Sequence, residues 1–453
     1  MELPSVLHRG ERARLFPVLA DTSKEGRTLS IFLACLENVD EFNKALLATI
    51  GQKVGARAKI ETYTEVVLVK GGEKTHRPDG LILIKSGAKQ WSALVEAKVG
   101  NSELTSEQLE NYLELAKINN IDSIVTLSNQ FASLPTHHPV HLPASARRKV
   151  EIFHWSWMHV VTQASLLISN EQVSDRDQRI ILNEMVRFLT HPSAGVKSFE
   201  QMPVAWSELV SAVQAGAKIS SNSSEIKEVV GAWHQELRDL SLILSRQLGT
   251  DVITRISRAH AADPSVRLKD TSVSLANEQC LFGIFIVPDA AAPIEICADI
   301  QKRSLYISMK LRSPNDKKST KARLNWLLRQ LHKSNPENIY IRLFWPGKTP
   351  STQYSLLHLR EDQDTPVNER AGQAVLSFEI FLVKDLGVRF SRRRNFIGEL
   401  ESAVPEFYLQ VGQHLRAWQP SAPRIRDDKS EPESVSAEAM SEEAEQVAFD
   451  RDE

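Results

Sequence analysis

The apolar positions change their period along the first part of the chain. Residues 23–50 carry apolar side chains at helical spacing, which predicts one or two helices. Short β-type runs follow at 58–69, 80–84 and 91–97. A Ser-Gly turn signal within 85–90 predicts that the last two of these runs pair as a hairpin.

A helix and two more strands complete this region. The spacing of apolar residues predicts the helix at 106–119 and buried strands at 123–127 and 151–155. The order helix, three strands, helix, strand, loop, strand describes an α/β sandwich of the α+β class, and we place this domain at residues 1–160.

The rest of the chain first keeps a helical period and then alternates. Residues 157–191 and 204–249 look helical throughout, and from about residue 270 the period returns to two, with short strands, a helix at 321–332 and a closing helix at 396–416. A tail rich in Ser, Glu, Pro and Asp is expected to be disordered. The predicted parts after the first domain are a helical connector (161–255), an α+β domain with an antiparallel sheet (256–419) and an acidic tail (420–453).

The composition favours a protein of the reducing cytosol. The 453 residues include three cysteines, none in a C-x-x-C pair, which argues against a disulfide framework and a zinc site. No segment is apolar enough for a signal peptide or a membrane span. We therefore expect a cytoplasmic protein with no membrane partner.

The net charge of −2 is unevenly distributed. Residues 427–453 contain eleven acidic side chains against Lys429 and Arg451, so the tail carries −9 and the remainder about +7. A mildly basic body is compatible with a polyanionic partner such as DNA, although such tails also serve solubility alone.

Two acidic motifs flank the predicted hairpin. Pro78-Asp79 precedes its first strand, and Glu96-Ala97-Lys98 ends its second, so antiparallel pairing brings Asp79 and Glu96 together. Glu96 and Lys98 are two residues apart and point to one face. Two carboxylates can grip a divalent cation while leaving positions open for water and a phosphate. A neighbouring lysine can orient or help deprotonate the water and balance charge on the phosphate.

These motifs resemble those of the PD-(D/E)XK nuclease superfamily, over roughly residues 20–160. Asp79 matches its first acidic motif, and Glu96 with Lys98 matches its E-x-K motif. Several members carry a Gln-x-x-x-Tyr pair on the next helix, where this chain has Gln108 and Tyr112, which lie on one helical face. The resemblance implies a restriction-endonuclease-like fold and Mg²⁺ (or Mn²⁺) as cofactor. It also implies that Gln108 supports catalysis.

The resemblance further implies a glutamate from the first helix as an extra metal ligand. Glu25 and Glu37 are the candidates; we place Glu25 in the metal set, although the sequence alone does not decide between them. Nucleic-acid contacts are expected from Tyr112 and from basic residues after the nuclease-like helix and near the closing helix, namely Arg147, Arg148, Arg392, Arg393 and Arg394.

The leading interpretation is a Mg²⁺-dependent endonuclease acting on DNA, whose C-terminal domain binds substrate or a protein partner. One alternative is a non-catalytic regulator of stress response or phage defence that binds nucleic acid or protein on the same fold. Another is an RNA-processing enzyme with the same site. The simplest is a surface hairpin on which Glu96 and Lys98 form a solvated ion pair of little energetic worth.

The histidines of the Pro-rich loop, His137, His138 and His141, have no partner at a metal-ligand spacing. A surface loop is expected there. Cys35 lies in an apolar helix and is expected to pack in the core.

Overall fold

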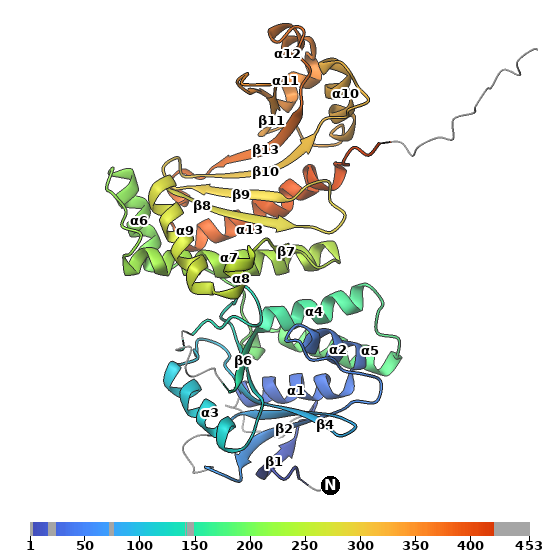
Figure 1. Cartoon of the computed structure of the whole chain (residues 1–453), viewed down its shortest axis with the longest axis vertical. Coiled ribbons are helices and arrows are strands. Elements are labelled where there is room, and N and C mark those ends of the chain that lie inside the picture. The colour runs from blue at the N-terminus through green and yellow to red at the C-terminus, as the bar shows by residue number, and fades with distance from the viewer. Residues whose placement is uncertain (1–2, 17–23, 72–76, 141, 143–148, 421–453) are drawn as a thin grey trace, which may run out of the picture. The chain divides into compact units, whose positions relative to one another are not determined.

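The computed structural model describes residues 3–16, 24–71, 77–140, 142 and 149–420. The fold is mixed α+β, as predicted, with two separate sheets (Figure 1). Within the described residues, no helix combines the length and apolar character needed to span a bilayer.

The first sheet has six strands in the order β1-β2-β3-β4-β5-β6. Strands β1 to β4 are antiparallel, whereas β4, β5 and β6 run parallel. The predicted hairpin is the β3–β4 pair, and the N-terminal strand β1 was not predicted. The strands are β1 (Leu7–Arg12), β2 (Lys59–Leu68), β3 (Gly80–Ser86), β4 (Lys89–Ala97), β5 (Ser123–Ser128) and β6 (Glu151–Ser156).

Helices cover both faces of this sheet. Helix α3 (Ser106–Ile118) packs on one face through Leu109 and Leu113. The opposite face carries the larger core, where Cys35 is fully buried as expected and Phe32 meets Trp155 and Trp157 edge to face. The helices of that second layer are α1 (Lys24–Asn38), α2 (Asp40–Ala48), α4 (Trp157–Ser169) and α5 (Arg176–Leu189).

The core of the first sheet extends past the predicted domain end at residue 160, which falls inside α4. Val160, Val161 and Ala164 belong to the same apolar cluster as α1, and so does Leu189 at the end of α5. These two helices thus complete the second layer of the sandwich.

The second sheet has seven antiparallel strands in the order β12-β11-β13-β10-β9-β8-β7. Alternate residues of each long strand enter one large core, which the helices also fill. The strands are β7 (Ile253–Thr254), β8 (Cys280–Ile286), β9 (Ile294–Asp299), β10 (Ser304–Arg312), β11 (Ile339–Phe344), β12 (Thr352–Ser355) and β13 (Ser377–Asp385).

The helices of this half include α7, which lies within the segment 204–249 that the sequence predicts to be helical. The alternating period also predicts a strand at 354–360, but β12 ends at Ser355, whose hydroxyl accepts from the His358 amide and caps a helix instead. The helices are α6 (Val204–Gln214), α7 (Ser224–Leu248), α8 (Arg258–Ala262), α9 (Pro264–Glu278), α10 (Thr320–Gln330), α11 (Leu356–Glu361), α12 (Asp364–Glu369) and α13 (Arg393–Gln410).

The histidine-containing loop is not simply at the surface. His137 is buried and its Nε2 lies 2.9 Å from the Ala261 carbonyl oxygen, and the Nε2 of His138 lies 2.9 Å from the Thr126 hydroxyl. Thr126 also lies 2.8 Å from Nδ1 of the buried His154. His141 falls outside the described residues.

His154 is held neutral by its burial. Its Nε2 lies 2.8 Å from the Gln130 carbonyl oxygen, so Nε2 donates and Nδ1 accepts from the Thr126 hydroxyl. Burial lowers the pKa of His154 from 6.5 to about 4. Between these two pH values, His154 is protonated in the unfolded chain and neutral in the folded chain. The free energy of unfolding therefore falls as the pH falls through this window.

We therefore expect unfolding free energy to drop by up to about 3 kcal/mol between pH 7 and pH 4 because of His154. Urea unfolding of wild type and His154→Gln at several pH values measures it. The variant should lose less stability on acidification than wild type. Equal slopes for the two proteins would contradict this assignment.

Candidate metal site

The register of the hairpin places the first two carboxylates. Gly80 pairs with Val95, so Asp79, one residue before β3, lies beside Glu96 near the end of β4. The Ala97 amide donates to Asp79 Oδ2 at 2.9 Å. One oxygen of Asp79 is therefore fixed by the backbone of the partner strand.

Glu25 supplies the third carboxylate from the first turn of α1. One carboxylate oxygen each from Glu25, Asp79 and Glu96 lie within 4.8 Å of one another. Glu96 is 1% exposed, whereas the other two are half-buried. This is the cluster that the structure brings together from the residues predicted as metal ligands.

Lys98 lies between two of these carboxylates. Its Nζ is 2.5 Å from Glu96 Oε1 and 3.1 Å from Glu25 Oε1. Burial by itself would lower the pKa of Lys98, but the negative charges of Glu96, Asp79 and Glu25 outweigh burial and raise it. Lys98 is thus a stable ammonium ion, and this protonation state opposes a role as a general base.

The pKa of Asp79 is also raised, which for a carboxyl group favours the neutral form. Burial raises the pKa of its carboxyl group, and the nearby charge of Glu96 raises it further. The Ala97 hydrogen bond and the Lys98 charge counteract this only in part. A carboxylate held in such surroundings is stabilised when a cation binds beside it.

Helix α3 presents Gln108 and Tyr112 to the cluster. Thr105 caps the helix by accepting from the Gln108 amide, and Gln108 Nε2 donates to Glu96 Oε1. Tyr112 is 4% exposed and donates its hydroxyl to the Arg77 carbonyl oxygen at 3.1 Å. The Tyr112 hydroxyl thus binds the loop before Asp79. The side chain of Tyr112 has little exposed surface for the predicted nucleic-acid contact.

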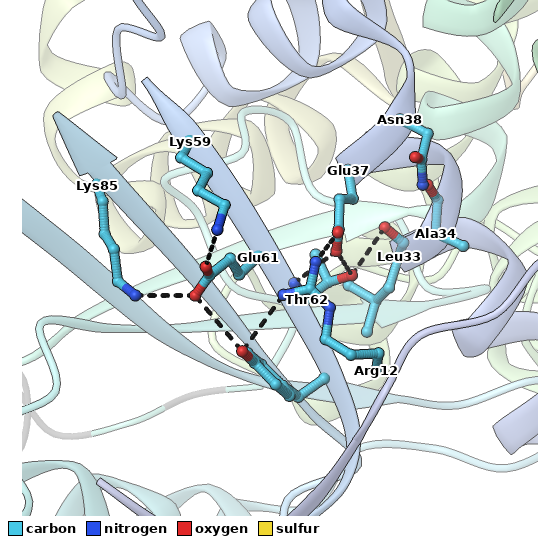
Figure 2. Close-up of polar contacts among 10 residues, drawn as sticks. Arg12, Leu33, Ala34, Glu37, Asn38, Lys59, Glu61, Thr62 and Lys85 are labelled. Atoms are coloured by element: carbon cyan, nitrogen blue, oxygen red, sulfur yellow. Dashed lines mark hydrogen bonds and ion pairs between the residues drawn. The ribbon is translucent and has the colours of Figure 1, made fainter. Parts of the chain in front are cut away.

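The carboxylate of Glu37 binds groups on β1 and β2 (Figure 2). Its carboxylate pairs with Arg12 and accepts from the amide and hydroxyl of Thr62, both at 2.9 Å. These contacts fasten α1 to β1 and β2. Of the two helix glutamates, the geometry therefore selects Glu25 for the metal set.

Figure 2 also shows a second polar group, on β2 and β3. Glu61 pairs with Lys59 at 2.7 Å and Lys85 at 2.9 Å. The hydrogen bonds from Lys59 and Lys85 lower the pKa of Glu61 to about 2. This carboxylate is already neutralised by two cations and has no need of a metal.

The arginines predicted to contact nucleic acid differ in what they bind. Arg147 and Arg148 lie outside the described residues. At the start of α13, Arg393 donates to the Met202 carbonyl oxygen and Arg394 pairs with Glu200 at 3.3 Å, while Arg392 is exposed. Arg393 and Arg394 thus contact the segment before α6 and not the carboxylate cluster.

Sequence reasoning missed the residues that line a pocket together with Asp79. This small pocket is lined by Gly26, Thr64, Glu65 and Arg77 among others. Glu65 has a positive φ of 51° and lies where the register between β1 and β2 shifts, between the pairs Arg9–Val67 and Glu11–Thr64. No composition or period signal in the sequence marks such a residue.

The donor set suits a hard divalent cation. Carboxylate oxygens are the ligands preferred by Mg²⁺ and Mn²⁺. Among the described residues, the buried Glu96 Oε2 has no hydrogen-bond partner, so this oxygen is an acceptor that a cation could use. The chemistry of Glu25, Asp79 and Glu96 therefore fits a metal, and the nearby Lys98 limits their total charge.

Comparisons of the chain with protein-family models, with curated proteins and with solved structures returned no match. The functional assignment therefore depends on the geometry of the site.

Proposed function

We propose that the chain is a metal-dependent nuclease that hydrolyses phosphodiester bonds of DNA. The observation that carries the proposal is the convergence of Glu25, Asp79 and Glu96 within 4.8 Å, with the Lys98 ammonium against two of them. In this proposal the first domain has the restriction-endonuclease-like layout of the PD-(D/E)XK nucleases.

The three carboxylates would hold Mg²⁺ or Mn²⁺, which, when bound, lowers the pKa of water and polarises a phosphoryl oxygen. Lys98, as an ammonium ion, balances negative charge that develops on the phosphate oxygens when the water oxygen attacks phosphorus and the ester P–O bond breaks. Gln108 donates to Glu96 and so keeps its carboxylate in one orientation.

The test is cleavage of plasmid DNA and of an RNA of the same sequence by purified protein, with Mg²⁺, Mn²⁺ or EDTA. Metal-dependent cutting of DNA is expected. Cutting of RNA alone would indicate the processing enzyme. Metal binding without cutting of either substrate would favour the non-catalytic regulator.

Two glutamates of α1 provide a matched pair of variants for the metal itself. Glu25→Gln is expected to weaken Mn²⁺ binding about tenfold or more, because it removes one charged ligand. Glu37→Gln should leave the affinity within about twofold, since Glu37 faces Arg12 and Thr62. Calorimetric titration measures both affinities. Equal affinities for the two variants would remove Glu25 from the site.

A further inference from the structure

The main chain around Lys98 is held by groups outside the carboxylate cluster. The Lys98 amide donates to the Leu127 carbonyl oxygen at 2.8 Å, and the Lys98 carbonyl oxygen accepts from Trp157 Nε1 at 2.8 Å. Trp157, the first residue of α4, is fully buried. Both polar groups of the Lys98 backbone are thus fixed, one by β5 and one by an indole.

A second contact fixes the chain two residues later. Asn129 Nδ2 donates to the carbonyl oxygens of Gly100, at 3.0 Å, and Gly195, at 2.8 Å. The Gly100 amide donates to the Gly195 oxygen, and Asn129 Oδ1 accepts from the Lys197 amide. Asn129 therefore joins the loop after β4 to the segment that follows α5.

The same indole touches the helix that carries Glu25. The rings of Trp157 and Phe32 meet at right angles with centroids 5.8 Å apart. Glu25 and Phe32 are seven residues apart in α1, which places them two turns apart on one side of the helix. Trp157 thus packs against α1 while it binds the main chain of Lys98.

We infer that Trp157 and Asn129 are positioning residues for Lys98, which they hold against Glu96 and Glu25 by binding the carbonyl oxygens of Lys98 and Gly100. This inference rests on the proposed function for its catalytic meaning. Among the described residues, the side-chain amide of Asn129 and the indole of Trp157 donate to carbonyl oxygens and not to the carboxylates, so both act through the main chain. Lys98 has a flexible four-carbon side chain, so a fixed backbone narrows the range of positions that its ammonium can take.

The chain offers a matched control for each residue. Trp155 is also fully buried, also meets Phe32 edge to face, at 6.3 Å, and also donates one indole hydrogen bond, to Thr49. Asn170 likewise donates its amide to a glycine carbonyl, that of Gly249, at 2.9 Å. Neither control residue binds the main chain of Lys98.

The experiment measures the reactivity of the Lys98 amine in the full chain without metal. Brief acetylation followed by mass spectrometry reports the labelling rate of Lys98, with exposed Lys59 as the internal reference. Trp157→Phe and Asn129→Ala should raise the Lys98 rate about fivefold, because the ammonium leaves its carboxylates more often. Trp155→Phe and Asn170→Ala should change it by less than about twofold.

Equal Lys98 labelling rates in wild type and all four variants would overturn the inference. Equal increases in the two variants and their two controls would also overturn it, because they would indicate that any of these substitutions loosens the fold. Asn129→Ala decides the matter if Trp157→Phe does not fold. Because labelling needs neither metal nor DNA, this outcome is independent of whether the protein cuts. If it does cut, the two variants should lower kcat with KM unchanged, a split that lost substrate binding would not give.

Discussion

Replacing Lys98 with methionine is expected to tighten Mn²⁺ binding about tenfold while lowering the cleavage rate by about 10³-fold. The ammonium group lies 2.5 Å from Glu96 Oε1 and 3.1 Å from Glu25 Oε1, and so competes with the cation for the same carboxylates. Without that positive charge the site attracts a cation more strongly. In the proposed reaction, the same substitution removes the charge that would stabilise the attacked phosphate.

Lys85→Met is the matched control, because Lys85 pairs with Glu61 on the other strand of the same hairpin. Its metal affinity and cleavage rate should stay near those of wild type. Calorimetric titration and a single-turnover cleavage assay measure the two quantities. If Lys98→Met bound Mn²⁺ more weakly than wild type, the lysine would be organising the carboxylates and not competing for them.

The second large effect is expected for Asp79→Asn, which should make the metal-free protein more stable at pH 8, by about 1 kcal/mol. Burial and the charge of Glu96 raise the pKa of Asp79, so ionising this group costs more in the folded chain than in the unfolded chain. An asparagine carries no such cost and its carbonyl can still accept from the Ala97 amide.

The size of this effect depends on pH. Above the raised pKa, Asp79 is ionised in both states and the full cost is present; as the pH falls toward the ordinary range of a carboxyl group the cost disappears. The advantage of Asp79→Asn should therefore shrink on acidification. Saturating Mg²⁺, at about 100 times its Kd, should stabilise wild type by about 2.7 kcal/mol and the variant far less.

Asp122→Asn provides the contrast for Asp79→Asn. Asp122 Oδ2 accepts from the amide and hydroxyl of Ser92, at 2.8 and 2.9 Å, so this carboxylate serves the fold. Urea unfolding should show that Asp122→Asn destabilises the protein at pH 8. A destabilised Asp79→Asn would mean that Asp79 is a structural carboxylate of the same kind.

Local patterns in the sequence were sufficient to predict the parts of the site that lie on the hairpin. Alternation of apolar residues and a Ser-Gly turn place Asp79 next to Glu96 without any knowledge of the remaining chain. A cap and a helical period likewise predict the helix that carries Gln108, and the family resemblance implies its place at the site. These features depend on residues close together in the sequence, for which periodicity is informative.

The features that sequence reasoning missed depend on contacts between distant segments. The choice of Glu25 over Glu37 depends on Arg12, on a strand that the sequence pattern did not reveal. Trp157 looks like an ordinary apolar residue at a helix start, and its bond to the Lys98 carbonyl emerges only when α4 packs on the sheet. Such contacts have no periodic signal.

The hydrogen bond between Asp79 and the Ala97 amide belongs to both the hairpin and the site. A strand that slips by one residue turns every side chain to the other face, so a shifted β4 would carry Glu96 and Lys98 away from Asp79 and place Ala97 in their stead. A bound cation would therefore favour one alignment of the two strands over its neighbours. If the site binds metal as proposed, folding of the hairpin and metal binding would be linked, and metal would stabilise the native register over its neighbours.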